Sequence, residues 1–381
     1  MIRFGSPAVL VALVLALIVG TAISLVQFDR QARTNPAMVQ FVPAGLGGFA
    51  DEQRARLLLA TDPIAAEPHV KNVVRARPVD GSHLSHLAIW AAEAGDMALA
   101  SQTLSEAARR GWRDTFVQIS VLGSAAAEQN LLVASQRLDA LARSKAQPAI
   151  LMRALDILLT VPGAETSLAE RLAESEYLQD VLVEYSRKRP GTGEALSVIV
   201  GAMPQYGTAL DCMRRASIVR SLARRGEAAA LKVWGTDCAT QTIDQLDFTF
   251  SERRDDPFAW NYQRGAGLAV TAGKERGSLT LSNRKLLEKV AAWRFLALPK
   301  GQHAIVVDKS GQVMRSFADR NPAKFTVSVL CVGDGLRSER TLGRVDESGV
   351  LSITVPDGCL TQKLNVRLGR GRVEDLKLTL Q

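Results

Sequence analysis

The chain has 381 residues, of which 47% are hydrophobic and 23% are charged, and its formal net charge is +8 at pH 7. This apolar content excludes a chain that is disordered throughout, and the length suits two ordinary domains with short additional segments. The positive charge favours anionic partners such as acidic glycans or lipid headgroups. No dense run of Lys and Arg interleaved with aromatic residues occurs, so we expect no nucleic-acid partner.

Residues 1–28 predict a transmembrane anchor. No charged residue occurs from Phe4 to Phe28, and a helix needs about 20 apolar residues to cross the hydrocarbon layer. The alternative is a cleaved signal peptide, because Gly20 and Ala22 supply small residues for a cleavage site. The apolar run is longer than the roughly 7–15 residues of a signal core, which favours an uncleaved, single-pass helix. Residues 29–50 contain several Gly and Pro residues and predict a linker.

Residues 51–239 predict a series of α-helices, because Ala, Leu, Glu and Arg dominate and the short breaks carry Gly or Pro. The segment Ser85–Arg110 aligns with the sequence 34 residues further on. The alignment places Ala91 on Ala125, Ala100 on Ala134, Gln102 on Gln136 and Leu104 on Leu138. This period resembles the tetratricopeptide repeat, a pair of antiparallel helices. The resemblance implies a solenoid-like domain whose surface holds a protein partner, and the alternative is an irregular helical bundle.

The four cysteines form two local pairs. Cys212 and Cys238 lie on either side of a predicted helix turn, and Cys331 and Cys359 adjoin two apolar runs near the C-terminus. The alternative is four unpaired buried thiols, a common state for cysteine. We expect the disulfides Cys212–Cys238 and Cys331–Cys359, which indicate an oxidising compartment. Charges flank the N-terminal helix on both sides and leave its orientation open, so the cysteines favour a position of the main chain outside the cytoplasm.

Residues 240–381 predict an antiparallel β-sandwich, because helical periodicity stops and short β-branched or alternating runs begin. Turn residues such as Lys309-Ser310-Gly311 and Pro356-Asp357-Gly358 separate these runs. The predicted strands are Phe248–Phe250, Gly267–Thr271, Ser278–Leu281, Arg294–Leu298, Ala304–Val307, Lys324–Leu330, Val350–Val355, Lys363–Leu368 and Val373–Leu380.

Three short motifs in this region resemble the carbohydrate-binding-like jelly-roll domains of secreted and envelope proteins. They are Pro257-Phe258-Ala259-Trp260, Leu298-Pro299-Lys300-Gly301 and Glu374-Asp375-Leu376-Lys377-Leu378. The resemblance implies a sugar-contacting surface, for which Trp260, Tyr262 and Trp293 are the candidate residues. Phe258, Trp260 and Tyr262 alternate, so in a strand they would share one face. The alternative is that these aromatics fill the core, since aromatic residues make up only 5% of the chain.

Motifs with catalytic or metal-binding chemistry are weak in this chain. His83 and His86 form an H-x-x-H pair with His69 upstream, but no third ligand occurs at motif spacing, and a helix start with exposed imidazoles is the simpler interpretation. Ser282 and Lys285 match S-x-x-K without the partner motifs of serine β-lactamase-like enzymes. The loop Arg189–Gly193 is too short to cradle phosphates. We therefore predict no catalytic residues, no metal site and no cofactor.

The whole architecture resembles Gram-negative envelope proteins that accompany polysaccharide synthesis or export. The resemblance implies a single-pass inner-membrane protein with its bulk in the periplasm, acting as a non-enzymatic scaffold for exopolysaccharide or envelope biogenesis. One alternative is a glycan-binding protein that recognises an acidic polysaccharide through the β-sandwich. A second alternative is a glycoside-active enzyme, which needs two carboxylates facing across a cleft.

Overall fold

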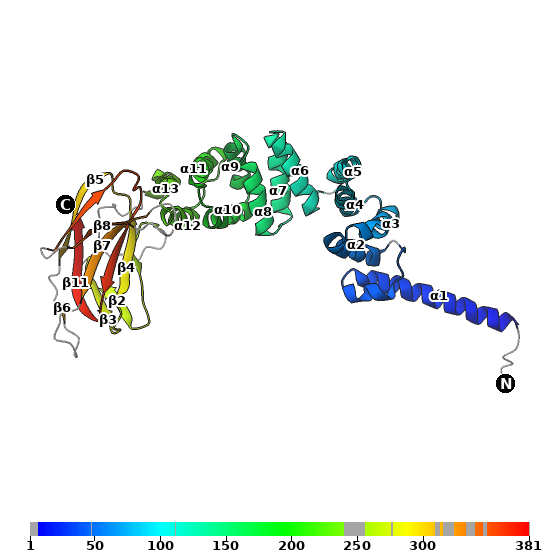
Figure 1. Cartoon of the computed structure of the whole chain (residues 1–381), viewed down its shortest axis with the longest axis horizontal. Coiled ribbons are helices and arrows are strands. Elements are labelled where there is room, and N and C mark those ends of the chain that lie inside the picture. Colours follow the sequence, from blue (N-terminus) through cyan, green and yellow to red (C-terminus); the bar gives the residue numbers. More distant parts are fainter. Residues whose placement is uncertain are drawn as a thin grey trace. The chain divides into compact units, whose positions relative to one another are not determined.

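The computed structural model describes residues 7–46, 48–110, 112–239, 256–275, 277–308, 313–314, 324–332, 340–345 and 349–380. Helices occupy the described chain up to Ala239, and antiparallel strands occupy it from Asn261 onward (Figure 1). This confirms the predicted order of helices followed by a β-sandwich. By internal packing the chain divides into two compact units, residues 1–158 and 159–381. The predicted change at residue 240 is a change of secondary structure and falls inside the second unit.

The first unit begins with α1 (Pro7–Ala32), which contains the apolar stretch Val9–Ala32. Among the described residues it is the one helix long and apolar enough to cross a membrane. Its last turn is folded into the unit, because Ala32 is fully buried beside Val42 and Ala50. The described part of the segment predicted as a linker, residues 29–50, contains local structure that packs against α1. Pro36 begins a 3₁₀ helix, and Gly45 takes a left-handed conformation with φ of 96°.

The helices that follow in the first unit form antiparallel pairs. Their bounds are η1 (Pro36–Phe41), α2 (Phe49–Thr61), η2 (Ile64–Ala66), α3 (Glu67–Ala76), α4 (Gly81–Glu93), α5 (Met97–Arg110), α6 (Thr115–Ala127), α7 (Leu131–Arg143) and α8 (Pro148–Leu158). The α4–α5 and α6–α7 pairs start 34 residues apart, as the sequence alignment predicts. The aligned Ala91 and Ala125 are 0% and 5% exposed, so small residues occupy equivalent buried positions in both pairs.

The turns inside these two pairs also match. The Asp96 N–H donates to the Ala91 carbonyl at 2.8 Å, and the Asn130 N–H donates to the Ala125 carbonyl at 2.7 Å. Gly95 takes the left-handed conformation that such helix ends require, with φ of 81°. Gln129, which stands where the first pair has Gly95, takes the same conformation with φ of 57°. The backbone repeat is thus kept even where the sequence repeat is broken.

The second unit begins with further helices and holds the first disulfide. These helices are α9 (Ala164–Glu174), α10 (Glu176–Lys188), α11 (Gly193–Ala202), η3 (Met203–Tyr206), α12 (Cys212–Ala223) and α13 (Ala229–Ala239). Cys212 at the start of α12 is bonded to Cys238 near the end of α13, with Cα atoms 5.6 Å apart. This confirms the predicted pairing, and Cys238 lies just after a break in α13 at Gly235, where φ is 69° and ψ is 171°.

The described strands of the second unit form two antiparallel sheets. One sheet has the order β1-β4-β10-β7-β8, and the other has the order β2-β3-β11-β5-β9 with β6 paired to β11. The bounds are β1 (Asn261–Tyr262), β2 (Leu268–Ala272), β3 (Leu279–Asn283), β4 (Lys289–Leu296), β5 (Gly301–Asp308), β6 (Val313–Met314), β7 (Phe325–Cys331), β8 (Arg340–Arg344), β9 (Val350–Val355), β10 (Gln362–Leu368) and β11 (Gly371–Leu380). The predicted strand Phe248–Phe250 lies outside the described residues.

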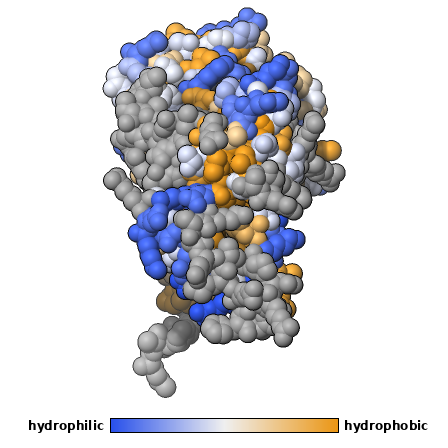
Figure 2. All heavy atoms as spheres, turned by 90° about the vertical axis from the view of Figure 1, so that its left-hand side faces the viewer, coloured by the Kyte–Doolittle hydropathy of each residue, from blue (hydrophilic) through white to orange (hydrophobic). Residues whose placement is uncertain are grey.

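The sandwich core is made by the inward-facing residues of both sheets. Leu281, Val329 and Leu364 are each fully buried in it. The predicted strand at Arg294–Leu298 begins earlier in the structure, at Lys289, because β4 pairs with β10 along its whole length. Figure 2 shows hydrophobic and hydrophilic residues side by side on the face of the molecule that it draws.

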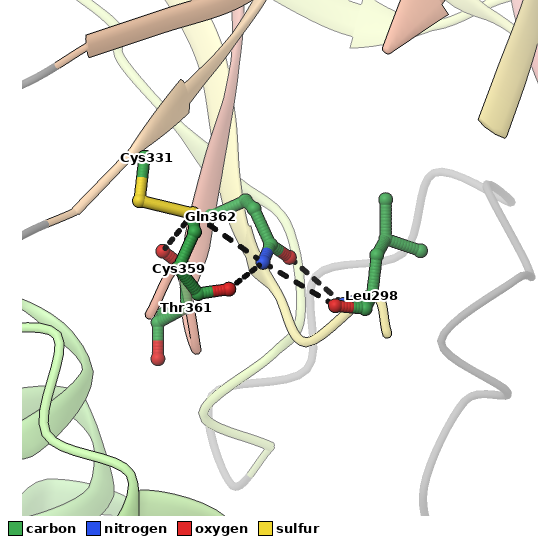
Figure 3. Close-up of a disulfide and its surroundings, with 5 residues drawn as sticks. All are labelled: Leu298, Cys331, Cys359, Thr361 and Gln362. Atoms are coloured by element: carbon green, nitrogen blue, oxygen red, sulfur yellow. Dashed lines mark hydrogen bonds between the residues drawn. A yellow bond between two sulfur atoms is a disulfide. The ribbon is translucent and has the colours of Figure 1, made fainter. Parts of the chain in front are cut away.

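One end of the sandwich is closed by a disulfide and a buried glutamine (Figure 3). Cys331 is bonded to Cys359, with Cα atoms 5.7 Å apart, which confirms the second predicted pairing. The fully buried Gln362 lies beside it and accepts a hydrogen bond from the Leu298 N–H at 2.8 Å. Its Nε2 donates to the carbonyls of Cys359 at 2.7 Å and Leu298 at 3.4 Å. We call this the closed end of the sandwich.

Candidate functional site at the membrane junction

The best-developed polar site among the described residues lies where α1 meets α2. The Asp29 carboxylate, in the last turn of α1, accepts a hydrogen bond from the Ala50 N–H at 2.9 Å and so caps α2. Gly48 is required beside it, since a Cβ there would lie 2.0 Å from Asp29 Oδ2. The Phe28 and Phe41 rings also pack with centroids 5.5 Å apart. We call this region, from Phe28 to the first turns of α2, the membrane junction.

A buried carboxylate holds the junction together from inside. Asp51 is 1% exposed and lies 2.8 Å from His69 Nδ1 and 3.4 Å from Arg54 Nη1. It also accepts a hydrogen bond from the Gly45 N–H at 3.2 Å. Arg54 reaches further, donating to the carbonyls of Val39 at 2.7 Å and of Val42. Asp51 therefore ties α2 to both α3 and the loop after η1.

Glu52 forms a second ionic cluster next to the first. Its carboxylate lies 2.7 Å from Arg56, 3.3 Å from Arg77 and 3.4 Å from His83 Nε2. The hydrogen bond from His83, helped by the charges of Arg56 and Arg77 and opposed by burial, lowers the pKa of Glu52 to about 2. Burial lowers the pKa of the neighbouring His86 imidazole. Glu52 is thus charged at any physiological pH.

Two cavities adjoin this cluster and share Gln53 and Arg56. The first has a volume of about 340 Å³ and a polar lining that includes Arg33, Arg56 and Arg77. The second is an open groove of about 720 Å³ with a mainly apolar lining from η1 and α2. Arg33 and Arg77 also stack on the Phe49 ring, at 5.4 Å and 4.3 Å from its centroid. The polar cavity also contains the carboxylates of Glu52 and Asp80, so its lining carries charges of both signs, whereas the groove suits hydrocarbon.

The three histidines singled out in the sequence are held in different ways. His69 pairs with Asp51, and His83 pairs with Glu52. His83 is 1% exposed, so the expectation of an exposed imidazole at a helix start is wrong for it. Over the parts of the chain that the structure describes, no three His, Cys, Asp or Glu side chains lie close enough together to hold a metal ion. Asp80, which caps α4, matches the expected helix start at this point.

The aromatic residues proposed for sugar contact do not form one surface. Trp260 is 3% exposed and lies in the sandwich core, with the guanidinium of Arg294 5.6 Å from its ring centroid. Tyr262 is half-buried and packs against the same core. Trp293 lies opposite Asn261 in the sheet and packs edge-on against Phe295, with centroids 5.2 Å apart. Trp260 therefore fills the sandwich core, as the alternative interpretation of these aromatic residues expects, and is not available as a surface for stacking a sugar.

Two further sequence motifs have structural roles. The loop at Arg189–Gly193 already holds a carboxylate of the chain itself. The N–H groups of Gly191 and Gly193 donate to Glu227 at 3.3 Å and 2.8 Å. Ser282 lies within β3 and not at a helix start, so the geometry that an S-x-x-K nucleophile needs is missing there.

The junction residues Asp29, Asp51 and Glu52 were not recognised from the sequence. The available signal was local: Asp51 and Glu52 stand in the first turn of a helix, where carboxylates are favoured. Several of their partners come from α3, from α4 and from the loop at Gly45 that precedes α2. The spacing of these residues in the sequence does not reveal the contacts. Comparison of the chain with protein-family models, with curated proteins and with solved structures finds no match.

Proposed function

We propose that the chain is a non-enzymatic, membrane-anchored scaffold that presents its helical region on the periplasmic side of the inner membrane, in polysaccharide or envelope biogenesis. The membrane junction is the observation that carries this proposal. Its core and the Asp29 cap pack the end of the membrane helix directly against the first helices. Such a joint fixes the orientation of the first helices relative to the membrane helix, which suits assembly of a membrane complex. The two disulfides support an oxidising compartment.

The α6–α7 pair offers a defined contact surface for a protein partner. Trp112, just before α6, is 50% exposed, and the Arg137 guanidinium from α7 lies 4.0 Å above its ring centroid. Phe116 in the first turn of α6 is also exposed. Gln118 accepts a hydrogen bond from Arg137 at 3.2 Å and fixes the guanidinium in place. Trp and Arg held rigidly at a surface are the residue types that dominate binding energy at protein interfaces.

The experiment is capture of partners by the full-length chain from native membranes in mild detergent, with bound proteins and glycans both identified. We expect a specific protein to be retained by the wild type and lost with Trp112→Ala. Leu132→Ala is the matched control, because Leu132 is 63% exposed at the start of the neighbouring α7. Retention of the same protein by Trp112→Ala would show that this surface is not the contact. Recovery of glycan without protein would favour the glycan-binding alternative.

Topology is tested separately with reporters fused after Gln381. A reporter that is active only in the periplasm should be active there. Activity of a cytoplasm-only reporter at the same position would reverse the orientation and contradict the proposed compartment.

A further inference from the structure

The end of the sandwich opposite the closed end displays two leucines in full view of solvent. Leu286 and Leu287, in the loop between β3 and β4, are 79% and 77% exposed. Such exposure is unusual for consecutive large apolar residues on a surface, and it points to a contact that the isolated chain lacks.

The loop that carries these leucines is fixed by a buried side chain. Asn283 is 2% exposed, and its Nδ2 donates to the carbonyls of Leu287 and Leu368, both at 2.9 Å. Its Oδ1 accepts from the Lys285 N–H at 2.9 Å, and the Arg284 N–H donates to the Gly267 carbonyl at 2.9 Å. The leucines are therefore held outward by an ordered turn.

Basic side chains surround the leucines at this end. The strand register places Asn283 opposite Gly371 and Lys289 opposite Leu368, so the β3–β4 and β10–β11 loops are neighbours. The Gly369 N–H donates to the Lys324 carbonyl at 2.7 Å, which adds the start of β7. The basic residues of these segments are Arg284, Lys285, Lys289, Lys324, Arg370 and Arg372, and the described acidic residues beside them are Glu288 and Glu374. We call this set, with Leu286 and Leu287, the basic loop end.

We propose that the basic loop end binds the surface of an anionic lipid bilayer, with Leu286 and Leu287 inserted among the headgroups. Positive charges are drawn to anionic lipid, and apolar side chains gain by entering the interface. An acidic polysaccharide would also attract these positive charges, but it has no apolar region in which Leu286 and Leu287 could be buried. This inference stands on the sandwich alone and does not depend on the scaffold proposal.

The test uses the full-length chain with α1 embedded in nanodiscs of phosphatidylcholine. These are mixed with sucrose-loaded vesicles of phosphatidylcholine, with or without phosphatidylglycerol, and sedimented. We expect nanodiscs to sediment only with the anionic vesicles, and binding to weaken as salt rises. Leu286→Ser with Leu287→Ser should weaken binding by about tenfold or more. Neutralising Lys285, Lys289 and Arg370 to Gln should weaken it by about fivefold for each residue removed.

Matched controls lie at the closed end. Leu360 is 50% exposed, and Lys300 is exposed and pairs with Asp357 at 2.6 Å. Leu360→Ser and Lys300→Gln should leave binding unchanged. The proposal is overturned if neutral and anionic vesicles bind equally, or if the leucine double variant binds anionic vesicles as the wild type does. It is also overturned if polygalacturonate is bound through the same basic residues while vesicles are not.

Discussion

The buried polar network at the membrane junction is ionic, whereas the one at the closed end of the sandwich is neutral. At the junction, Asp51 and Glu52 are paired with arginine and histidine side chains. At the closed end, Gln362 joins two loops beside a disulfide and carries no charge. Both networks satisfy groups that would otherwise be buried without partners. We therefore expect acid to lower the stability of the membrane junction, and a reductant to lower the stability of the closed end, where the disulfide lies.

The largest expected effect comes from breaking the ionic network. Asp51→Ala removes a buried carboxylate and leaves His69 and Arg54 without it, so it should cost the junction about 3–5 kcal/mol. Hydrogen exchange of the α2 and α3 amides in full-length protein in nanodiscs measures this. Glu67→Ala is the control, because Glu67 forms an exposed pair with Lys71 and should change stability by less than about 0.5 kcal/mol. Unchanged exchange in Asp51→Ala would show that the ionic network does not hold the junction.

Removing the sandwich disulfide should have the next largest effect. Cys331 and Cys359 are separated by 28 residues in sequence, and a loop of that length corresponds to about 3–4 kcal/mol of lost stability. Cys331→Ala with Cys359→Ala should therefore speed exchange of the β7 and β10 amides and leave α2 unaffected. An equal loss of exchange protection in the sandwich strands and in α2 would show that the two regions unfold together. That result would contradict the separate roles assigned to the two networks.

Gln362→Leu tests the neutral network with the disulfide intact. The change leaves the Leu298 N–H and the Cys359 carbonyl buried without these partners, so we expect a loss of about 2–3 kcal/mol. The same exchange measurement on β4 and β10 checks it, and the loss should be independent of pH. A loss that grows as pH falls would show that ionisable groups contribute at this end.

Acid should weaken the junction through Glu52. The pKa of Glu52 is about 2 in the folded protein and about 4.5 in the unfolded chain. The folded state therefore binds the proton of Glu52 less readily than the unfolded state does. The stabilisation is complete above about pH 4.5 and is lost as pH falls towards 2, by on the order of 2 kcal/mol after allowance for solvent screening. Glu52→Gln should remove this pH dependence from the α2 and α4 amides. Its persistence in the variant would assign it to other groups.

Much of the fold followed from local sequence signals. The apolar N-terminal helix, the switch from helices to strands, most strand positions and both cysteine pairings were predicted. The equivalent turns at Gly95 and Gln129 show why the helix repeat was recognisable only in part. Backbone hydrogen bonds keep the turn even where a non-glycine residue must take a positive φ.

The sites were harder to predict, because their residues act through tertiary contacts. Alternation shows that Trp293 and Phe295 share a face, but not which face is the core, and a shift of one residue exchanges the two. In the structure the intervening Arg294 is fully buried and lies opposite Leu364 on the core side, and Phe295 on the other face is also buried, at 2% exposed. Asp29 gave no sequence signal as a cap, since the helix that it caps begins about twenty residues later.

The fused junction makes α1 a mechanical element. The part of α1 before Asp29 measures about 33 Å at 1.5 Å per residue, which is close to a hydrocarbon layer of about 30 Å. In a bilayer, a change in thickness would change the tilt of such a helix. Because Asp29 and Ala32 belong to the folded junction, η1 and α2 would rotate together with α1 as one rigid body. A change in membrane thickness would therefore reorient the first helices together with α1.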